Sequence, residues 1–79
     1  MSRKDYVQLA DIIGRTLGAA WHHGGEDART AVYGELYDGT VALLASDNPA
    51  FDRHRFSFAV GKAEQSYAMD RAETRHNVQ

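Results

Sequence analysis

The sequence predicts an all-α protein: a small three-helix domain with a helical or frayed C-terminal extension. Two observations support this fold class. Apolar residues recur at helical spacing through most of the first 46 positions. The only proline, Pro49, follows an asparagine and precedes a helix-capping aspartate, so one helix should end there and another begin. A chain of 79 residues forms one domain at most, with a small core.

The first helix is expected over residues 3–23. Ser2 and Asp5 resemble a capping box, with Asp where Glu is usual. Gly24 and Gly25 should end the helix through left-handed αL geometry. Its inward stripe follows the i, i+3/i+4, i+7 pattern and comprises Tyr6, Leu9, Ala10, Ile13, Leu17, Ala20 and Trp21.

Gly14 and Gly18 lie four residues apart on the edge of this stripe. Each costs about 1 kcal/mol relative to alanine in a helix. The pair could allow another helix to approach closely. We favour the plainer interpretation, in which they are small residues on the flank of the helix.

Residues 26–46 fit two structures. The Asp38-Gly39 pair, between residues that tolerate β-structure, is a hairpin signal. A hairpin, however, would place Glu35 between two tyrosines on one face, and a lone hairpin is marginal in stability. We therefore predict a helix. Its broad apolar face comprises Val32, Tyr33, Leu36, Tyr37, Thr40, Leu43 and Leu44.

The third helix is expected over residues 52–61 or longer. Asp52 is placed to cap it, and Phe51 and Phe56 then occupy the two positions of a hydrophobic staple. Its inward stripe comprises Phe56, Ala59, Val60, Ala63 and Tyr67 if it continues past Gly61. We accordingly divide the chain into a helical domain, residues 1–61, and an extension, residues 62–79, that is helical or flexible.

Two segments resemble a family of small uncharacterised proteins encoded by tailed bacteriophages, especially those of actinobacteria. One segment is the opening, residues 2–6 with residues 10–13. The other is residues 46–56, followed by Val60-Gly61, which is similar to an Asp-Asn-Pro-x-Phe-Asp-x-x-x-Phe block near the C-terminus of such proteins. The resemblance covers residues 2–61 and favours helices on both sides of the block. It implies a phage origin and the cytoplasm of an infected bacterial host, and it brings no catalytic residues.

Several classes of function find no support in the sequence. Without cysteine there is no thiolate chemistry and no cysteine-rich zinc site. The four histidines have neither HxxxH nor HExxH spacing, so we expect no metal and no cofactor. No serine has fixed catalytic partners, and so small a chain leaves little room for a typical ligand pocket of about 300 Å³ or more. We predict that the protein is not an enzyme, and that no segment spans a membrane.

Four residues remain as candidate contacts for a partner or an anion. Arg53 and Arg55 place positive charge at a helix N-terminus, against the helix dipole. Nearby carboxylates such as Asp47 and Asp52 explain them most simply; the alternative is an anion site. Phe58 falls outside the inward stripe, and Met69 falls on the same outer side of a continued helix. With Tyr67 they could form a patch for a partner or for self-association.

The predicted function is that of a non-enzymatic phage accessory protein that binds a host or phage protein, or itself. The alternative is a small DNA-binding regulator with Arg53, Arg55 and Lys62 on phosphates. A formal net charge of −2 disfavours DNA binding by the whole surface.

Overall fold

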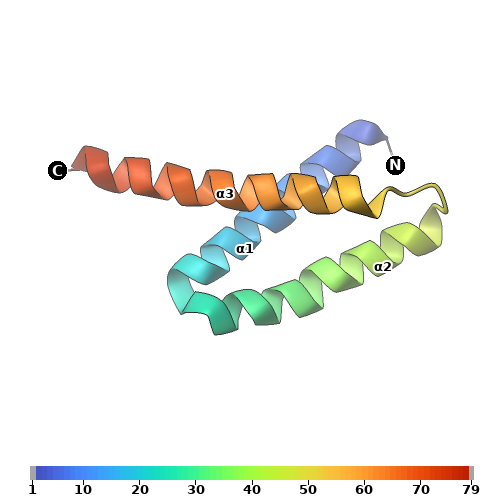
Figure 1. Ribbon diagram of the computed structural model, residues 1–79, viewed down its shortest axis with the longest axis horizontal. Coiled ribbons are helices and arrows are strands. Elements are labelled where there is room, and N and C mark those ends of the chain that lie inside the picture. Colours follow the sequence, from blue (N-terminus) through green and yellow to red (C-terminus); the bar gives the residue numbers. More distant parts are fainter. Residues whose placement is uncertain (1, 79) are drawn as a thin grey trace.

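The structure is a computed structural model that describes the backbone of residues 2–78 and the side chains of residues 2–70. Every regular element in this part of the chain is helical, so the all-α prediction is confirmed and the hairpin alternative is wrong. The elements are α1 (Arg3–Val32), a π-helical turn η1 (Tyr33–Tyr37), α2 (Asp38–Asp47) and α3 (Arg53–Val78) (Figure 1). None of the helices described is both long and apolar enough to cross a membrane.

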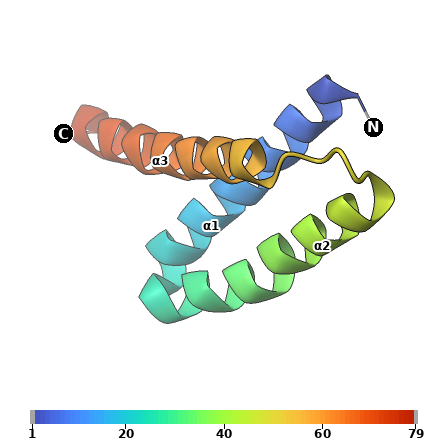
Figure 2. The same cartoon turned by 45° about the vertical axis from the view of Figure 1, so that its right-hand side comes forward.

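A break at Gly25 divides α1 into two arms. The first arm, residues 3–24, begins with the predicted capping box between Ser2 and Asp5. The second arm, residues 26–47, contains the end of α1, η1 and α2, and it runs back from the bend at an angle to the first arm (Figure 2). Gly25 has φ 74° and ψ −160°, so the predicted αL geometry is wrong. This extended region at positive φ is open almost only to glycine, because a Cβ collides with the backbone there.

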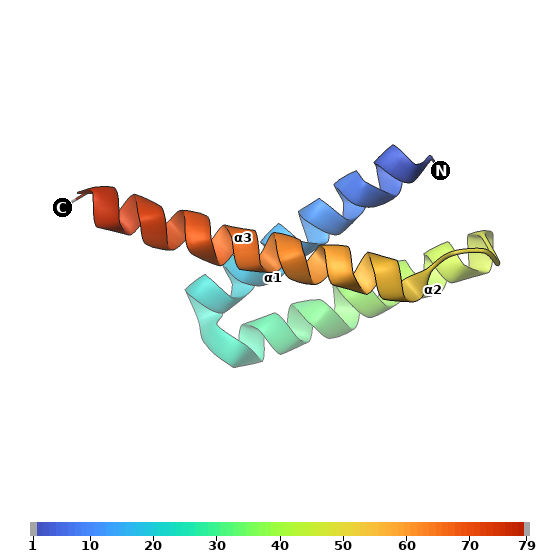
Figure 3. The same cartoon turned by 45° about the horizontal axis from the view of Figure 1, so that its top comes forward.

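The first arm and α3 cross at Gly14 and Gly18, where α3 passes over α1 (Figure 3). A Cβ on Gly14 would lie 2.4 Å from the carbonyl oxygen of Val60, and one on Gly18 would lie 2.8 Å from the Tyr67 ring. The plainer interpretation of these glycines is therefore wrong. They are glycines because the crossing helix leaves no space for a side chain.

Trp21 is a second correction to the first arm, since it is 53% exposed rather than part of the core. The buried stripe on this arm comprises Ala10, Ile13, Gly14, Leu17 and Gly18. The crossing with α3 covers the helix around Gly14 and Gly18, and Trp21 lies nearly one turn beyond it. Helical spacing identifies a face correctly, but it does not give the length over which a partner covers that face.

The second arm buries a narrower face than predicted. Its buried residues are Tyr37, Val41 and Leu44, whereas Leu43 is 69% exposed. The π turn explains part of the difference, because its i→i+5 hydrogen bonds add a residue to one turn and shift the helix face. Asp38 begins such a bond, its N–H donating to the carbonyl of Tyr33. Val32 thereby packs against the same core as Tyr37.

The third helix is capped at Asp52 and runs through Gly61 without a break to Val78. Phe56, Val60 and Ala63 are buried as predicted, so the core includes a residue beyond position 61. Tyr37 and Ser57 join the second arm to α3 by a hydrogen bond between their hydroxyls. The whole molecule measures 49 × 26 × 15 Å, which is thin enough to leave large apolar side chains uncovered.

Candidate functional site

The connection between α2 and α3 is held by hydrogen bonds from both sides of Pro49. Asn48 ends α2, its N–H donating to the carbonyl of Leu44 at 2.9 Å. Its side-chain oxygen accepts from the N–H of Ala50 at 3.0 Å, and its carbonyl accepts from the N–H of Phe51. Asp52 then accepts the N–H of Arg55 at 3.0 Å as the predicted N-cap. The segment is therefore a rigid turn and not a flexible linker.

Aromatic rings link this turn to the start of α1. The rings of Phe51 and Phe56 meet edge to face at 5.5 Å, which confirms the hydrophobic staple. Phe51 also packs against Tyr6, with ring centroids 5.7 Å apart. Asn48 donates its side-chain N–H to the Tyr6 hydroxyl at 3.3 Å. The N-terminal turn of α1 and the start of α3 thus share one aromatic cluster.

A groove of about 410 Å³ opens over this cluster, so the expectation that the chain has little room for a pocket is wrong. We call it the hinge groove. Aromatic and aliphatic side chains form most of its lining, and Arg3, Asp52 and Arg55 supply the charges. The full lining is Arg3, Tyr6, Val7, Asn48, Ala50, Phe51, Asp52, Arg55, Phe56 and Ala59.

Within the described side chains, no ion pair joins Arg3, Arg53 or Arg55 to a carboxylate. Asp52, the nearest acid in sequence, instead accepts a backbone N–H as the helix cap. Arg55 lines the hinge groove and Arg53 does not. The two predicted arginines therefore do not line the same groove. Arg55 lines it together with Arg3, which the sequence did not single out. No local pattern could have identified Arg3, because it reaches the groove only through the packing of α1 against α3.

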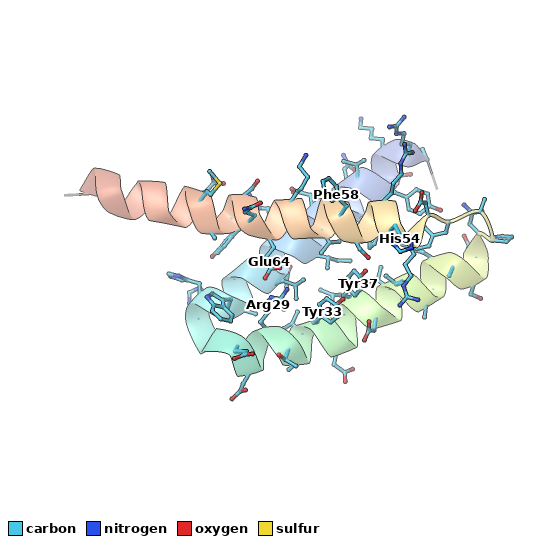
Figure 4. The ribbon with its side chains drawn as sticks, in the orientation of Figure 1. Arg29, Tyr33, Tyr37, His54, Phe58 and Glu64 are labelled. Carbon is cyan, nitrogen blue, oxygen red and sulfur yellow. The ribbon has the colours of Figure 1, made fainter. Side chains whose placement is uncertain are left out.

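The predicted apolar residues Phe58 (Figure 4) and Met69 lie exposed on α3, at 69% and 67%. They do not form one patch with Tyr67, which turns toward Gly18 and carries the Arg15 guanidinium over its ring. The Lys62 ammonium lies 5.6 Å from the centre of the Phe58 ring. Lys62 therefore places a positive charge beside Phe58 on this surface.

A second groove, of about 400 Å³, lies where the second arm faces α3. Arg29 and Glu64 meet there in a two-bond ion pair, one bond being 2.8 Å long (Figure 4). The Glu64 hydrogen bond raises the pKa of Arg29 above its ordinary value. Burial raises the pKa of the neighbouring Tyr33 phenol. No pattern in the sequence indicates this pair, because Arg29 lies on the second arm and Glu64 lies on α3.

Metal ligands do not gather in the part of the molecule whose side chains are described. Between residues 2 and 70, no three His, Cys, Asp or Glu side chains lie close enough to hold an ion. His22 and His23 stack edge to face at 5.1 Å, and His54 lies on α3. The side chain of His76 lies outside the described residues.

Comparison of the chain with protein-family models, with curated proteins and with solved structures gives no match. The resemblance to small tailed-phage proteins therefore stays a prediction from the sequence.

Proposed function

We propose that this protein is a non-enzymatic accessory protein that binds another protein through the hinge groove. One observation carries the proposal: two arginines without an ion-pair partner among the described side chains line a groove that Tyr6, Phe51 and Phe56 also line. Such a site suits a peptide segment in which a carboxylate lies beside an aromatic or aliphatic side chain. Arginine binds carboxylates with two parallel hydrogen bonds, and the rings supply apolar contact area.

The rigidity of the site supports this function. Asn48, Asp52 and Tyr6 hold the turn by hydrogen bonds, so little conformational entropy is lost when a ligand binds. Most of the lining of the groove also comes from the two segments that carry the phage resemblance, residues 2–6 and 46–56; Val7 and Ala59 lie outside them. We extend the proposal on that ground to a phage origin and to action in the cytoplasm of an infected bacterial host.

The test compares two variants that remove the same type of side chain. Arg3→Ala with Arg55→Ala alters the hinge groove, and Arg53→Ala removes an exposed arginine that does not line it. Binding of a short peptide that ends in phenylalanine with a free carboxylate is followed by NMR. We expect shifts at Tyr6 and Phe51 that are lost in the double variant, retained in Arg53→Ala and weaker for the amidated peptide. Equal binding by all three proteins would contradict the proposal.

DNA binding is the second candidate, because Arg53, Arg55 and Lys62 are exposed on α3. The acidic net charge of −2 and the contact of Lys62 with Phe58 count against it. A gel-shift assay at low salt separates the two functions. A phosphate-binding patch loses affinity in Arg53→Ala as well as in Arg55→Ala, whereas the hinge groove depends on Arg55 and not on Arg53.

A further inference from the structure

The second arm is uncharged and mostly apolar just before its C-terminal residue, Asp47. Residues 39–46 contain no charged side chain. Only Val41 and Leu44 of this stretch are buried, so most of its uncharged surface faces outward. A helix that is apolar all round is normally covered on all sides. This helix lacks a cover in the single chain.

Four residues on the uncovered side form a regular stripe, which we call the Leu-Gly stripe: Leu36, Gly39, Leu43 and Ser46. Large and small residues alternate along it, at spacings of three, four and three. Leu43 is 69% exposed, and a Cβ built on Gly39 would meet no atom within 4 Å. The stripe therefore presents a projecting Leu43 next to an open position at Gly39, with Leu36, 36% exposed, at its start.

This pattern is complementary to itself when reversed. The spacing is the same in both directions, and reversal exchanges each large residue with a small one. Two antiparallel stripes related by a two-fold axis would place Leu43 of each copy against Gly39 of the other. Leu36 would face Ser46 in the same way. Two-fold dimers require a surface that matches itself, and alternating large and small residues interdigitate.

We propose that two copies of this chain associate through the Leu-Gly stripe, with their second arms antiparallel. The absence of charge on the stripe removes the like-charge contacts that would oppose this pairing. The stripe is only about 15 Å long, which places the dimer among weak, transient associations. The proposal is independent of the hinge groove, which is lined by other residues.

Salt dependence distinguishes this surface from the hinge groove. Each copy has a net charge of −2, so copies repel one another and added salt should strengthen the dimer. Binding of a carboxylate by Arg3 and Arg55 should weaken under the same change. Binding of a basic partner to this acidic protein would also weaken with added salt. An association that salt strengthens therefore indicates self-association and not a basic partner.

Sedimentation equilibrium from micromolar to millimolar concentration tests the proposal. Gly39→Leu fills the open position and Leu43→Ala removes the projecting side chain, and each should raise the dimer Kd about tenfold or more. The double variant exchanges the two features and should restore association toward the original level. Circular dichroism checks that each variant keeps its helix content, and Phe58→Ala is the matched control for an exposed apolar residue elsewhere.

Dimerisation that the single changes weaken and the double change recovers would support the Leu-Gly stripe. A wild-type chain that stays monomeric at millimolar concentration would overturn it. Failure of the double variant to recover, in proteins of unchanged helix content, would do the same, as would loss of association in Phe58→Ala.

Discussion

Gly14 lies so close to Ala63 that a Cβ built on the glycine would stand 2.5 Å from the Ala63 methyl carbon. The carbonyl oxygen of Val60 lies equally near that position. Contact at this range leaves no space for even the smallest side chain. The α1–α3 crossing therefore requires glycine at position 14, as it does at Gly18.

Gly14→Ala should lower the free energy of unfolding by about 1–3 kcal/mol, because the added methyl group forces the helices apart. Helix propensity alone favours alanine over glycine by about 1 kcal/mol. A lower free energy of unfolding in Gly14→Ala would therefore come from the packing. Gly61→Ala is the control, since a Cβ there meets nothing within 4 Å, and it should raise stability. Urea unfolding measures both. A stabilised Gly14→Ala variant would contradict the packing described.

Gly25→Ala should cost about 1–3 kcal/mol through backbone strain alone, because φ is 74° and nothing lies within 4 Å of the added Cβ. Gly34→Ala offers the comparison: it also has open space, but its backbone is helical. In thermal unfolding, Gly25→Ala should be less stable than the wild type and Gly34→Ala more stable. Equal stability of the two variants would contradict the positive-φ backbone described at Gly25.

Breaking the Arg29–Glu64 pair should lower the free energy of unfolding by about 1–2 kcal/mol, since both side chains are partly buried and joined by two charged hydrogen bonds. Glu64→Gln and Arg29→Met, singly and together, give the coupling by a double-mutant cycle. Asp70→Asn breaks the more exposed Arg15–Asp70 pair and should cost less than about 0.5 kcal/mol. A coupling near zero would mean that the pair contributes nothing.

Tyr33 should make stability fall at alkaline pH. Its pKa is raised above the ordinary value of 10.0, so the folded protein holds the phenol proton more tightly than the unfolded chain does. That contribution is complete below pH 10.0 and is lost as the pH rises through the folded pKa. Urea unfolding of wild type and Tyr33→Phe should show a stability difference that shrinks with rising pH. A difference independent of pH would refute the assignment.

The features predicted correctly from sequence are those set by nearby residues. The Ser2–Asp5 capping box, the Asp52 cap and the Phe51–Phe56 staple each depend on groups within five positions. The choice of helix over hairpin followed from the position of Glu35 between two tyrosines and from the marginal stability of a lone hairpin. Local rules are sufficient for these features because the groups that interact lie only a few positions apart in the sequence.

The features that were missed depend on where one helix crosses another. The exposure of Trp21 and Leu43, and the contact made by Gly14, follow from the crossing point of α3 and the π turn. The Arg29–Glu64 pair and the position of Arg3 in the hinge groove arise in the same way. Spacing along one helix carries no information on the partner's angle or length.

The order of helix packing has a consequence for synthesis of the chain. The closest packing joins α1 to α3, whereas η1 and α2 between them make fewer close approaches to either helix. A chain growing from the ribosome can form the caps of α1 and the break at Gly25 early. It cannot close the Gly14–Ala63 contact until α3 has emerged as far as Ala63. Loop closure between distant segments is slow relative to local helix formation, so docking of α3 should set the folding rate.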